Sequence, residues 1–217
     1  MICQKNKLID FSEHKKIARF SVPENHRFSW HSQKPKRFLI LRCFIAVDIP
    51  EKAREEIVKV QKILEKRNLF MGKLTEKENL HLTLKFLGEI DEGKVGDVKK
   101  KLKEIKFSRF KVKLREIGVF SEDFVRIIWA HLSGKGVLEL QKEIDEKLDG
   151  FFPKEKRFMS HLTIARVKSV KNREKLLEEL SKIKLNCEFE VDRFFLKKST
   201  LTGEGPIYEN LLELNLS

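Results

Sequence analysis

Residues 81–88 of the chain read HLTLKFLG, and a second stretch, HLTIARV, begins at His161. Both are short apolar runs with the composition of a buried strand, and both start with a histidine that is followed two places later by a threonine. Side chains at positions i and i+2 leave the same face of a strand. His81 and Thr83 are therefore expected to project together, and His161 and Thr163 to do the same.

Each histidine–threonine pair has the chemistry of half a phosphate site. A hydroxyl can donate a hydrogen bond to a phosphoryl oxygen, and an imidazole, which titrates near neutral pH, can move a proton. The neighbouring side chains of Leu82, Leu84 and Phe86 would point the other way, into a core. Two such halves facing one another across one phosphorus atom would form a complete site, and we expect the fold to bring them together.

The alternative is that these histidines are structural, which is the more common role of a single histidine at the start of a strand. The recurrence of His-Leu-Thr before an aliphatic residue argues against coincidence. A third pair, His131 and Ser133, runs directly into a turn at residues 134–136, and we interpret His131 as structural.

The composition indicates a globular protein of one domain or two small lobes. The 217 residues include 17 phenylalanines to fill a core and 36% charged residues to cover it. No apolar run approaches the roughly 18 residues that span a bilayer, and no signal peptide is evident. Cys3, Cys43 and Cys187 are odd in number and widely spaced, so neither a disulfide framework nor a zinc site is expected. We predict a cytoplasmic protein with no metal or other cofactor and no membrane association.

The net charge of +13 favours a polyanionic partner, and nucleic acid is the leading candidate. The charge is uneven, because residues 1–40 hold nine Lys or Arg against three Asp or Glu. The abundance of Lys and Glu would also suit a heat-adapted protein, so charge alone does not establish RNA binding.

Residues 1–40 differ from the remainder, being polar and aperiodic. We expect an N-terminal extension that is disordered or loosely packed, ahead of one two-lobed domain at residues 41–217. Two alternatives remain for the extension: a basic arm that binds nucleic acid, or a segment upstream of a biological start near Leu41.

Hydrophobic periodicity predicts alternating strands and helices followed by hairpins. The expected strands are 42–49, the two motif strands from 81 and 161, 107–119, 124–132, 187–197 and 207–216; the expected helices are 51–66, 91–105, 137–148 and 172–183, with a loop at 73–79. This order is two copies of a similar unit and favours an α+β fold with antiparallel or mixed sheets. The absence of a GxGxxG or Walker loop argues against nucleotide cofactors and kinase chemistry.

The motifs resemble those of the two-histidine phosphoesterase superfamily, and in detail its RNA 2′,3′-cyclic phosphodiesterase branch, historically called 2′-5′ RNA ligase. The resemblance covers about residues 41–217 and is carried by RCFIAV (42–47), HLTLKFLG (81–88), RIIWA (126–130), SHLTIAR (160–166), LKKSTLT (196–202) and GPIY (205–208). It implies two lobes related by a pseudo-twofold axis, each a sheet with helices packed outside, and a cleft between them. It also implies metal-free opening of an RNA-terminal 2′,3′-cyclic phosphate to a 2′-phosphomonoester, with 2′-5′ ligation as the reverse.

The chemistry agrees with this resemblance. Opening a cyclic diester needs a base to activate water and an acid to protonate the departing 3′ oxygen, in line across phosphorus. The resemblance implies that His81 is the proton donor and His161 the proton acceptor, while Thr83 and Thr163 hold the non-bridging oxygens. Because the two motifs are nearly symmetric, the residues alone leave the two histidine roles open.

Five further residues are candidates for substrate binding. Arg166 would add positive charge at the phosphate, although strict alternation turns it away from His161 unless a bulge intervenes; an ion pair is the alternative. Strict alternation places Lys85 on the same face of its strand as His81. Phe44 would stack a terminal base or belong to the core. Arg126 and Trp129 belong to the resemblance, and Trp129 can equally be packing. We interpret Tyr208 as a structural residue near the cleft.

The expected partner is RNA with a 2′,3′-cyclic phosphate end, with tRNA halves as one candidate, and a monomer is the default assembly. Two other functions stay open. One is hydrolysis of other small cyclic or 2′-5′ phosphodiesters. The other is RNA binding without catalysis, which a missing motif histidine would indicate; both motif histidines are present.

Overall fold

A computed structural model describes residues 39–217, and the extension expected at residues 1–40 falls almost entirely outside this range. The strands are β1 (Ile40–Asp48), β2 (Phe70–Leu74), β3 (His81–Asp91), β4 (Phe110–Val119), β5 (Ile127–Ser133), β6 (His161–Val170), β7 (Lys184–Val191), β8 (Arg193–Leu201) and β9 (Pro206–Asn215). The helices are α1 (Glu51–Arg67), α2 (Glu92–Lys103), α3 (Lys135–Lys147) and α4 (Arg173–Lys182), with a 3₁₀ turn, η1, at Lys77–Asn79. The predicted α+β class is confirmed.

The nine strands form one sheet in the order β7-β4-β5-β6-β3-β1-β8-β9, with β2 added alongside β6. Every strand pair with a register in residues 39–217 is antiparallel. The order reads symmetrically about its centre: β6 and β3 are the inner strands, β5 and β1 flank them, and two more strands follow on each side. The two halves of the sheet meet at the pair Leu82 and Leu162. The predicted duplication is therefore visible in the strand order.

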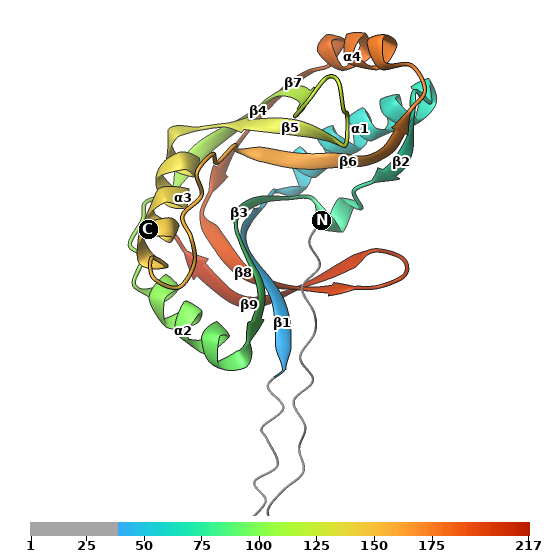
Figure 1. The fold of residues 1–217 in the computed structure, drawn as a ribbon. Coiled ribbons are helices and arrows are strands. Elements are labelled where there is room, and N and C mark those ends of the chain that lie inside the picture. Colours follow the sequence, from blue (N-terminus) through green and yellow to red (C-terminus); the bar gives the residue numbers. More distant parts are fainter. Residues whose placement is uncertain (1–38) are drawn as a thin grey trace, which may run out of the picture. The chain divides into compact units, whose positions relative to one another are not determined.

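The helices lie in two pairs (Figure 1). One pair is α2 with α3, which contact each other and pack against β3 and neighbouring strands. The other is α1 with α4, which Arg67 and Glu179 join by an ion pair at 2.8 Å; α1 packs against β6 and β7, and α4 against β4. The apolar core lies between the helices and the sheet, so the opposite face of the central strands is left for a site.

Local sequence signals set most element boundaries. Pro50 precedes α1, where a fixed φ and a missing N–H cost nothing. Asp91 and Asn172 cap α2 and α4, since each side chain accepts a hydrogen bond from the backbone N–H three residues later. Asn68 ends α1 in the left-handed conformation, with φ of 50°.

Two parts of the strand prediction are wrong. The predicted strand 187–197 is two strands, β7 and β8, which separate at Asp192. They belong to opposite halves of the sheet, with β7 at one edge and β8 next to the edge strand β9 at the other. The second error is β2, which was not predicted and whose last two residues fall in the predicted loop 73–79. The β4–β5 hairpin is confirmed by its antiparallel register. No helix within residues 39–217 is long and apolar enough to cross a membrane.

Candidate active site

The two His-x-Thr motifs lie side by side at the centre of the sheet. Leu82 of β3 pairs with Leu162 of β6 in antiparallel register. On the face opposite these leucines, this register sets each motif histidine across from the threonine of the other motif. The four motif side chains, His81, Thr83, His161 and Thr163, line one pocket with a volume of about 570 Å³.

A matching bulge in each motif strand decides which later residues reach the pocket. In β3, Thr83 pairs with Ala46 and Lys85 with Ile45, so Leu84 is an extra residue. In β6 the pairs made by Thr163 and Ala165 leave Ile164 as the extra residue in the same way. One extra residue reverses the alternation of side chains that follows it.

After each bulge, the side chains point to the face of the sheet opposite to the one that simple alternation predicts. Phe86, predicted to lie in the core, is 67% exposed and lines the pocket. Arg166 lines the pocket as well, so the bulge alternative holds for it. Lys85 was predicted to share the face of His81, and this is wrong: it is 2% exposed and lies on the helix side of the sheet.

Lys85 is held away from the pocket by a buried network. Its Nζ forms an ion pair with Asp145 of α3 at 2.5 Å and donates to the carbonyl oxygen of Pro153 at 2.7 Å. The Asp145 carboxylate also accepts from Gln141 and from the backbone N–H of Glu155. A buried charge needs this satisfaction, so Lys85 serves the structure rather than the pocket.

The imidazole of His81 is fixed at both ring nitrogens. Its Nδ1 lies 2.7 Å from the carbonyl oxygen of Asn79, which can only accept, so Nδ1 carries the proton. Its Nε2 lies 3.0 Å from Thr83 Oγ1 and faces the pocket. Burial lowers the pKa of His81 from 6.5 to about 4, against the opposing hydrogen bond to Asn79. The ring is therefore neutral near pH 7.

His161 repeats this arrangement on β6. Its Nδ1 lies 2.9 Å from the carbonyl oxygen of Met159, two residues earlier, as Asn79 is to His81. The matching tautomer leaves Nε2 of both histidines without a proton and able to exchange one with a ligand, while Thr83 Oγ1 hydrogen-bonds to Nε2 of His81. The ring of Phe120 packs edge-on against His161, with centroids 4.9 Å apart.

Aromatic side chains line the His81 side of the pocket. The rings of Phe44 and Tyr208 lie 5.0 Å and 5.2 Å from His81 between centroids, and 5.0 Å from each other. Phe86 lies next to Phe44 at 6.3 Å. Phe44 is thus a buried residue of the pocket wall, while Tyr208, interpreted as structural, contacts a motif histidine directly.

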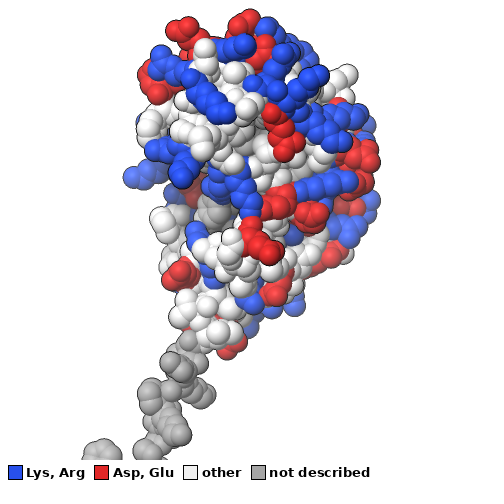
Figure 2. All heavy atoms as spheres, turned by 90° about the vertical axis from the view of Figure 1, so that its right-hand side faces the viewer, with Lys and Arg blue, Asp and Glu red and all other residues white. Residues whose placement is uncertain are grey.

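The charge of the pocket lining is basic. Arg42, Lys73 and Arg166 line it together with a single carboxylate, Glu76. Figure 2 shows many Lys and Arg side chains over the upper part of one face, interspersed with Asp and Glu side chains. Such a lining favours an anionic ligand. In residues 39–217 no group of three or more His, Cys, Asp or Glu side chains could hold a metal ion.

Arg126 and Trp129, predicted to bind substrate, do not line the pocket. The guanidinium of Arg126 stacks on the ring of Phe124 and donates to the carbonyl oxygen of Lys168. Trp129 is buried against Phe120, and its ring fills the space in front of Gly118, where a Cβ would lie only 2.5 Å from it. Packing is therefore the role that the structure gives Trp129.

Several pocket residues were missing from the predicted set, among them Arg42, Lys73, Glu76, Asn79, Phe86 and Tyr208. Phe86 reaches the pocket because of the bulge at Leu84, and the sequence contains no local signal of that bulge. Arg42 and Tyr208 stand inside the segments that carry the family resemblance, and this position was the available signal. Lys73 arrives through β2, whose pairing with β6 links residues far apart in the chain.

An antiparallel sheet whose central strands present matching His-x-Thr pairs to one basic pocket has the arrangement of a phosphoesterase. The chain matches the family described as LigT like Phosphoesterase over residues 47–129 and 133–208. It belongs to that family.

Several relatives span nearly the whole described region. A protein of Methanocaldococcus jannaschii named RNA 2′,3′-cyclic phosphodiesterase is 43% identical over 177 residues, covering 80% of this chain and 99% of that protein. One of the same name from Archaeoglobus fulgidus is 38% identical, covering 79% and 98%. Among solved structures, TT0787 of Thermus thermophilus aligns with a TM-score of 0.70 at 27% identity, covering 81% of this chain and 98% of that one. Escherichia coli LigT, at 22% identity and a TM-score of 0.68 over 82% and 98% of the two chains, shares the fold.

Proposed function

We propose that this protein hydrolyses the 2′,3′-cyclic phosphate at the end of an RNA strand to a 2′-phosphomonoester. The observation that carries the proposal is the presentation of two His-x-Thr pairs, from β3 and β6, to one basic pocket. The names of the relatives from Methanocaldococcus jannaschii and Archaeoglobus fulgidus support the same substrate.

The reaction exchanges one phosphorus–oxygen bond for another. A water oxygen attacks phosphorus as the bond to the 3′ oxygen breaks, and the 2′ ester stays intact. One imidazole Nε2 takes the proton that the water loses, and the other supplies the proton that the 3′ oxygen gains. Two histidines on neighbouring strands, both holding Nδ1–H on a carbonyl oxygen, offer the two Nε2 atoms that this exchange requires.

We assign His81 as the proton donor and His161 as the acceptor, as the family resemblance implies. His81 must then gain a proton as substrate binds, because burial holds its pKa near 4 in the empty pocket. A phosphate anion beside the ring supplies the cause, since a nearby negative charge favours the imidazolium. The neutral imidazole of the empty pocket is thus converted to the acid by the substrate itself.

The remaining pocket residues fit the substrate. Thr83 and Thr163 donate to the non-bridging oxygens, and the Arg166 guanidinium adds charge that a reaction without a metal requires. Phe86 and Tyr208 offer ring surfaces for the terminal base, with Phe44 packed against both rings, and a stacked base contributes about 1–3 kcal/mol. The pocket volume of about 570 Å³ lies in the range of small-molecule sites, so it suits one nucleotide with the chain leading outward.

An oligonucleotide with a defined 2′,3′-cyclic phosphate end tests the proposal by product analysis. We expect a 2′-phosphate product, formed equally well in the presence of EDTA. His81→Ala and His161→Ala should each lower turnover by at least about 100-fold with the fold intact. His131→Gln is the matched control, because His131 lies outside the pocket lining and contacts Glu116. Full turnover in either motif variant would contradict the proposal.

The finer expectations belong to the same proposal. With an RNA of free 5′-hydroxyl in excess, the reverse reaction would join the two strands through a 2′-5′ linkage, and tRNA halves are a natural pair to assay. The same preparation, run on a sizing column with light scattering, tests the expected monomer.

A further inference from the structure

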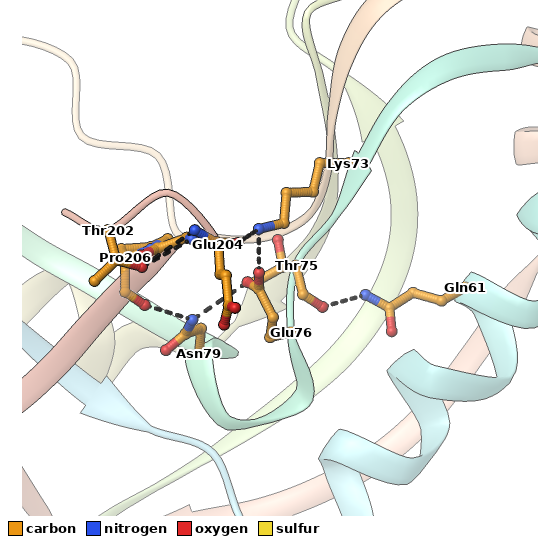
Figure 3. Close-up of polar contacts among 9 residues, drawn as sticks. Gln61, Lys73, Thr75, Glu76, Asn79, Thr202, Glu204 and Pro206 are labelled. Atoms are coloured by element: carbon orange, nitrogen blue, oxygen red, sulfur yellow. Dashed lines mark hydrogen bonds and ion pairs between the residues drawn. The ribbon is translucent and has the colours of Figure 1, made fainter.

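The segment from Lys73 to Asn79 connects both motif strands to the β8–β9 hairpin (Figure 3). It runs from the end of β2 through η1 and stops two residues before β3 begins at His81, and it contributes Lys73, Thr75, Glu76 and Asn79 to the pocket lining. Its backbone and side chains make contacts in three directions.

The first contact is with β6, at the bulge. The backbone N–H of Thr75 donates to the carbonyl oxygen of Ile164 at 2.9 Å. Gln61 of α1, which is 6% exposed, donates through Nε2 to the same oxygen at 3.1 Å and to the Thr75 carbonyl oxygen at 2.7 Å. The extra residue of a bulge lacks a regular ladder partner, so Ile164 can accept both bonds. This anchor lies next to Thr163.

The second contact is with the hairpin. The Asn79 side chain donates through Nδ2 to the carbonyl oxygen of Pro206, the first residue of β9, at 2.9 Å and to Glu76 Oε2 at 3.2 Å. Glu76 in turn forms an ion pair with Lys73 at 2.5 Å, and Lys73 donates to the Glu204 carbonyl oxygen. In Figure 3 these side chains converge on the hairpin loop from the η1 side.

The hairpin loop fits closely against this group. Thr202 Oγ1 donates to the carbonyl oxygen of Gly205 at 2.7 Å and accepts from the backbone N–H of Glu204 and Gly205, which closes the loop on itself. A Cβ on Gly205 would lie 2.7 Å from Lys73 Nζ and 2.8 Å from Glu76 Oε1, and its φ of 151° disfavours other residues. The loop therefore approaches closely because residue 205 is glycine.

The third contact is with His81. The Asn79 carbonyl oxygen accepts from Nδ1–H, and this bond sets which tautomer and ring orientation face the pocket. Tyr208 lies two residues beyond Pro206 on β9 and covers the same ring edge-on. Anchoring Pro206 through Asn79 thus also places Tyr208 against His81.

We propose that Asn79 is a positioning residue, whose side chain holds the β8–β9 hairpin while its carbonyl oxygen orients His81 for proton transfer. The inference rests on the proposed function of His81. Without the anchor, the carbonyl and the Tyr208 ring lose their fixed places, and Nε2 no longer keeps its direction. Misplacement of a reacting group by about 1 Å can lower turnover by about 100-fold.

Two substitutions at Asn79 and one at Gly205 test this. Asn79→Ala removes the anchor, and Asn79→Asp replaces the donor by a carboxylate facing Glu76 and the Pro206 carbonyl oxygen. Gly205→Ala places a Cβ against Lys73 Nζ and Glu76 Oε1 and so disturbs the same group of contacts from the hairpin side. We expect all three to lower kcat for the cyclic-phosphate oligonucleotide about 10- to 100-fold with KM changed less than about threefold. Asn215→Ala, on an exposed residue at the far end of β9, is the matched control and should keep wild-type kinetics.

A second readout is the NMR titration of His81 in the free protein, assigned with His81→Gln. Burial keeps this pKa near 4, so release of the hairpin should raise it toward 6.5 in the three variants and leave it unchanged in Asn215→Ala. Wild-type kinetics and an unchanged titration in a folded Asn79 or Gly205 variant would overturn the inference. A change confined to KM would do the same, since it would make Asn79 a substrate contact. If the wild-type protein cleaves no cyclic phosphate, the proposed function fails, and the titration still decides whether Asn79 positions the ring.

Discussion

Leu82 of β3 and Leu162 of β6 face each other in antiparallel register where the two halves of the sheet meet. Both side chains are fully buried on the helix side, and each stands between the histidine and threonine of its motif. Their pairing sets the distance and the offset of the two motifs on the other face. The geometry of the pocket therefore depends on apolar packing behind it.

The first prediction concerns that packing. Leu162→Ala should lower the free energy of unfolding by about 2–5 kcal/mol, because it removes buried methyl groups and leaves a cavity between the halves. It should also lower turnover at temperatures where the protein stays folded, because the motifs are no longer held in register. Urea unfolding and steady-state kinetics measure the two effects. Leu138→Ala, at an exposed position of α3, is the control and should change stability by less than about 0.5 kcal/mol.

The second prediction separates two arginines. Arg166→Gln should lower kcat/KM for the cyclic-phosphate oligonucleotide by about 10- to 100-fold, since it removes a pocket charge that is proposed to pair with phosphate oxygens. Arg126→Gln should leave the same constant within about twofold, because its guanidinium rests on Phe124 outside the pocket. An equal loss in both variants would mean that the RNA path extends over Phe124.

Much of this fold was readable from the sequence. The apolar runs, the proline before α1 and the capping residues Asp91 and Asn172 are local signals, and the elements that they mark are present. The His-x-Thr spacing predicted that each pair shares a face, and it does so because the bulges come after the threonines. Strand composition and spacing thus sufficed for the motif side chains themselves.

The errors begin one residue beyond the motifs. The bulges at Leu84 and Ile164 arise from pairing with β1 and β5, which is long-range, so alternation alone misplaced Lys85 and Phe86. The break at Asp192 likewise reflects where β7 and β8 find partners, not the composition of the segment. Residues that reach the pocket through such pairings carry no local signature.

The third prediction tests the corrected place of Lys85. Lys85→Met should lower the free energy of unfolding by about 3–5 kcal/mol, because it leaves the Asp145 carboxylate buried without its cation. The hydrogen bonds from Lys85, Gln141 and Glu155 outweigh burial and lower the pKa of Asp145, in keeping with a charged partner. The double variant Lys85→Met, Asp145→Leu should regain part of the loss in a thermal or urea unfolding series. KM should stay at the wild-type value in both variants. A large rise in KM would mean that Lys85 contacts the substrate and would contradict its assignment to the buried network.

The fourth prediction concerns stability and pH. The folded-state pKa of His81, about 4, lies below its value of 6.5 in an unfolded chain, so the unfolded state binds more protons between these values. The contribution of this residue to stability is therefore complete above pH 6.5 and is lost as pH falls toward 4. The loss is about 1–3 kcal/mol once solvent screening at the pocket is allowed for. In urea titrations, the wild-type protein should show this decline relative to His81→Gln, and parallel curves would contradict it.

The fifth prediction decides between the two histidine roles. A protein with His161→Ala should bind the cyclic-phosphate oligonucleotide without cleaving it. The cyclic diester does not titrate near neutral pH, so any proton that is taken up on binding must be taken up by the protein. If His81 is the donor, binding at pH 7 should take up a measurable fraction of one proton, because the anion raises the His81 pKa from about 4 toward the working pH. Calorimetry in two buffers of different ionisation enthalpy measures this number, and a second substitution, His81→Gln, should abolish the uptake.

The affinity of the His161→Ala variant for the oligonucleotide should also weaken as pH rises. The ligand binds best to the protein with His81 protonated, and the protonated fraction falls as pH rises. Binding with no proton uptake and no dependence on pH would leave His81 neutral beside the phosphate and would make it the acceptor, with His161 as the donor.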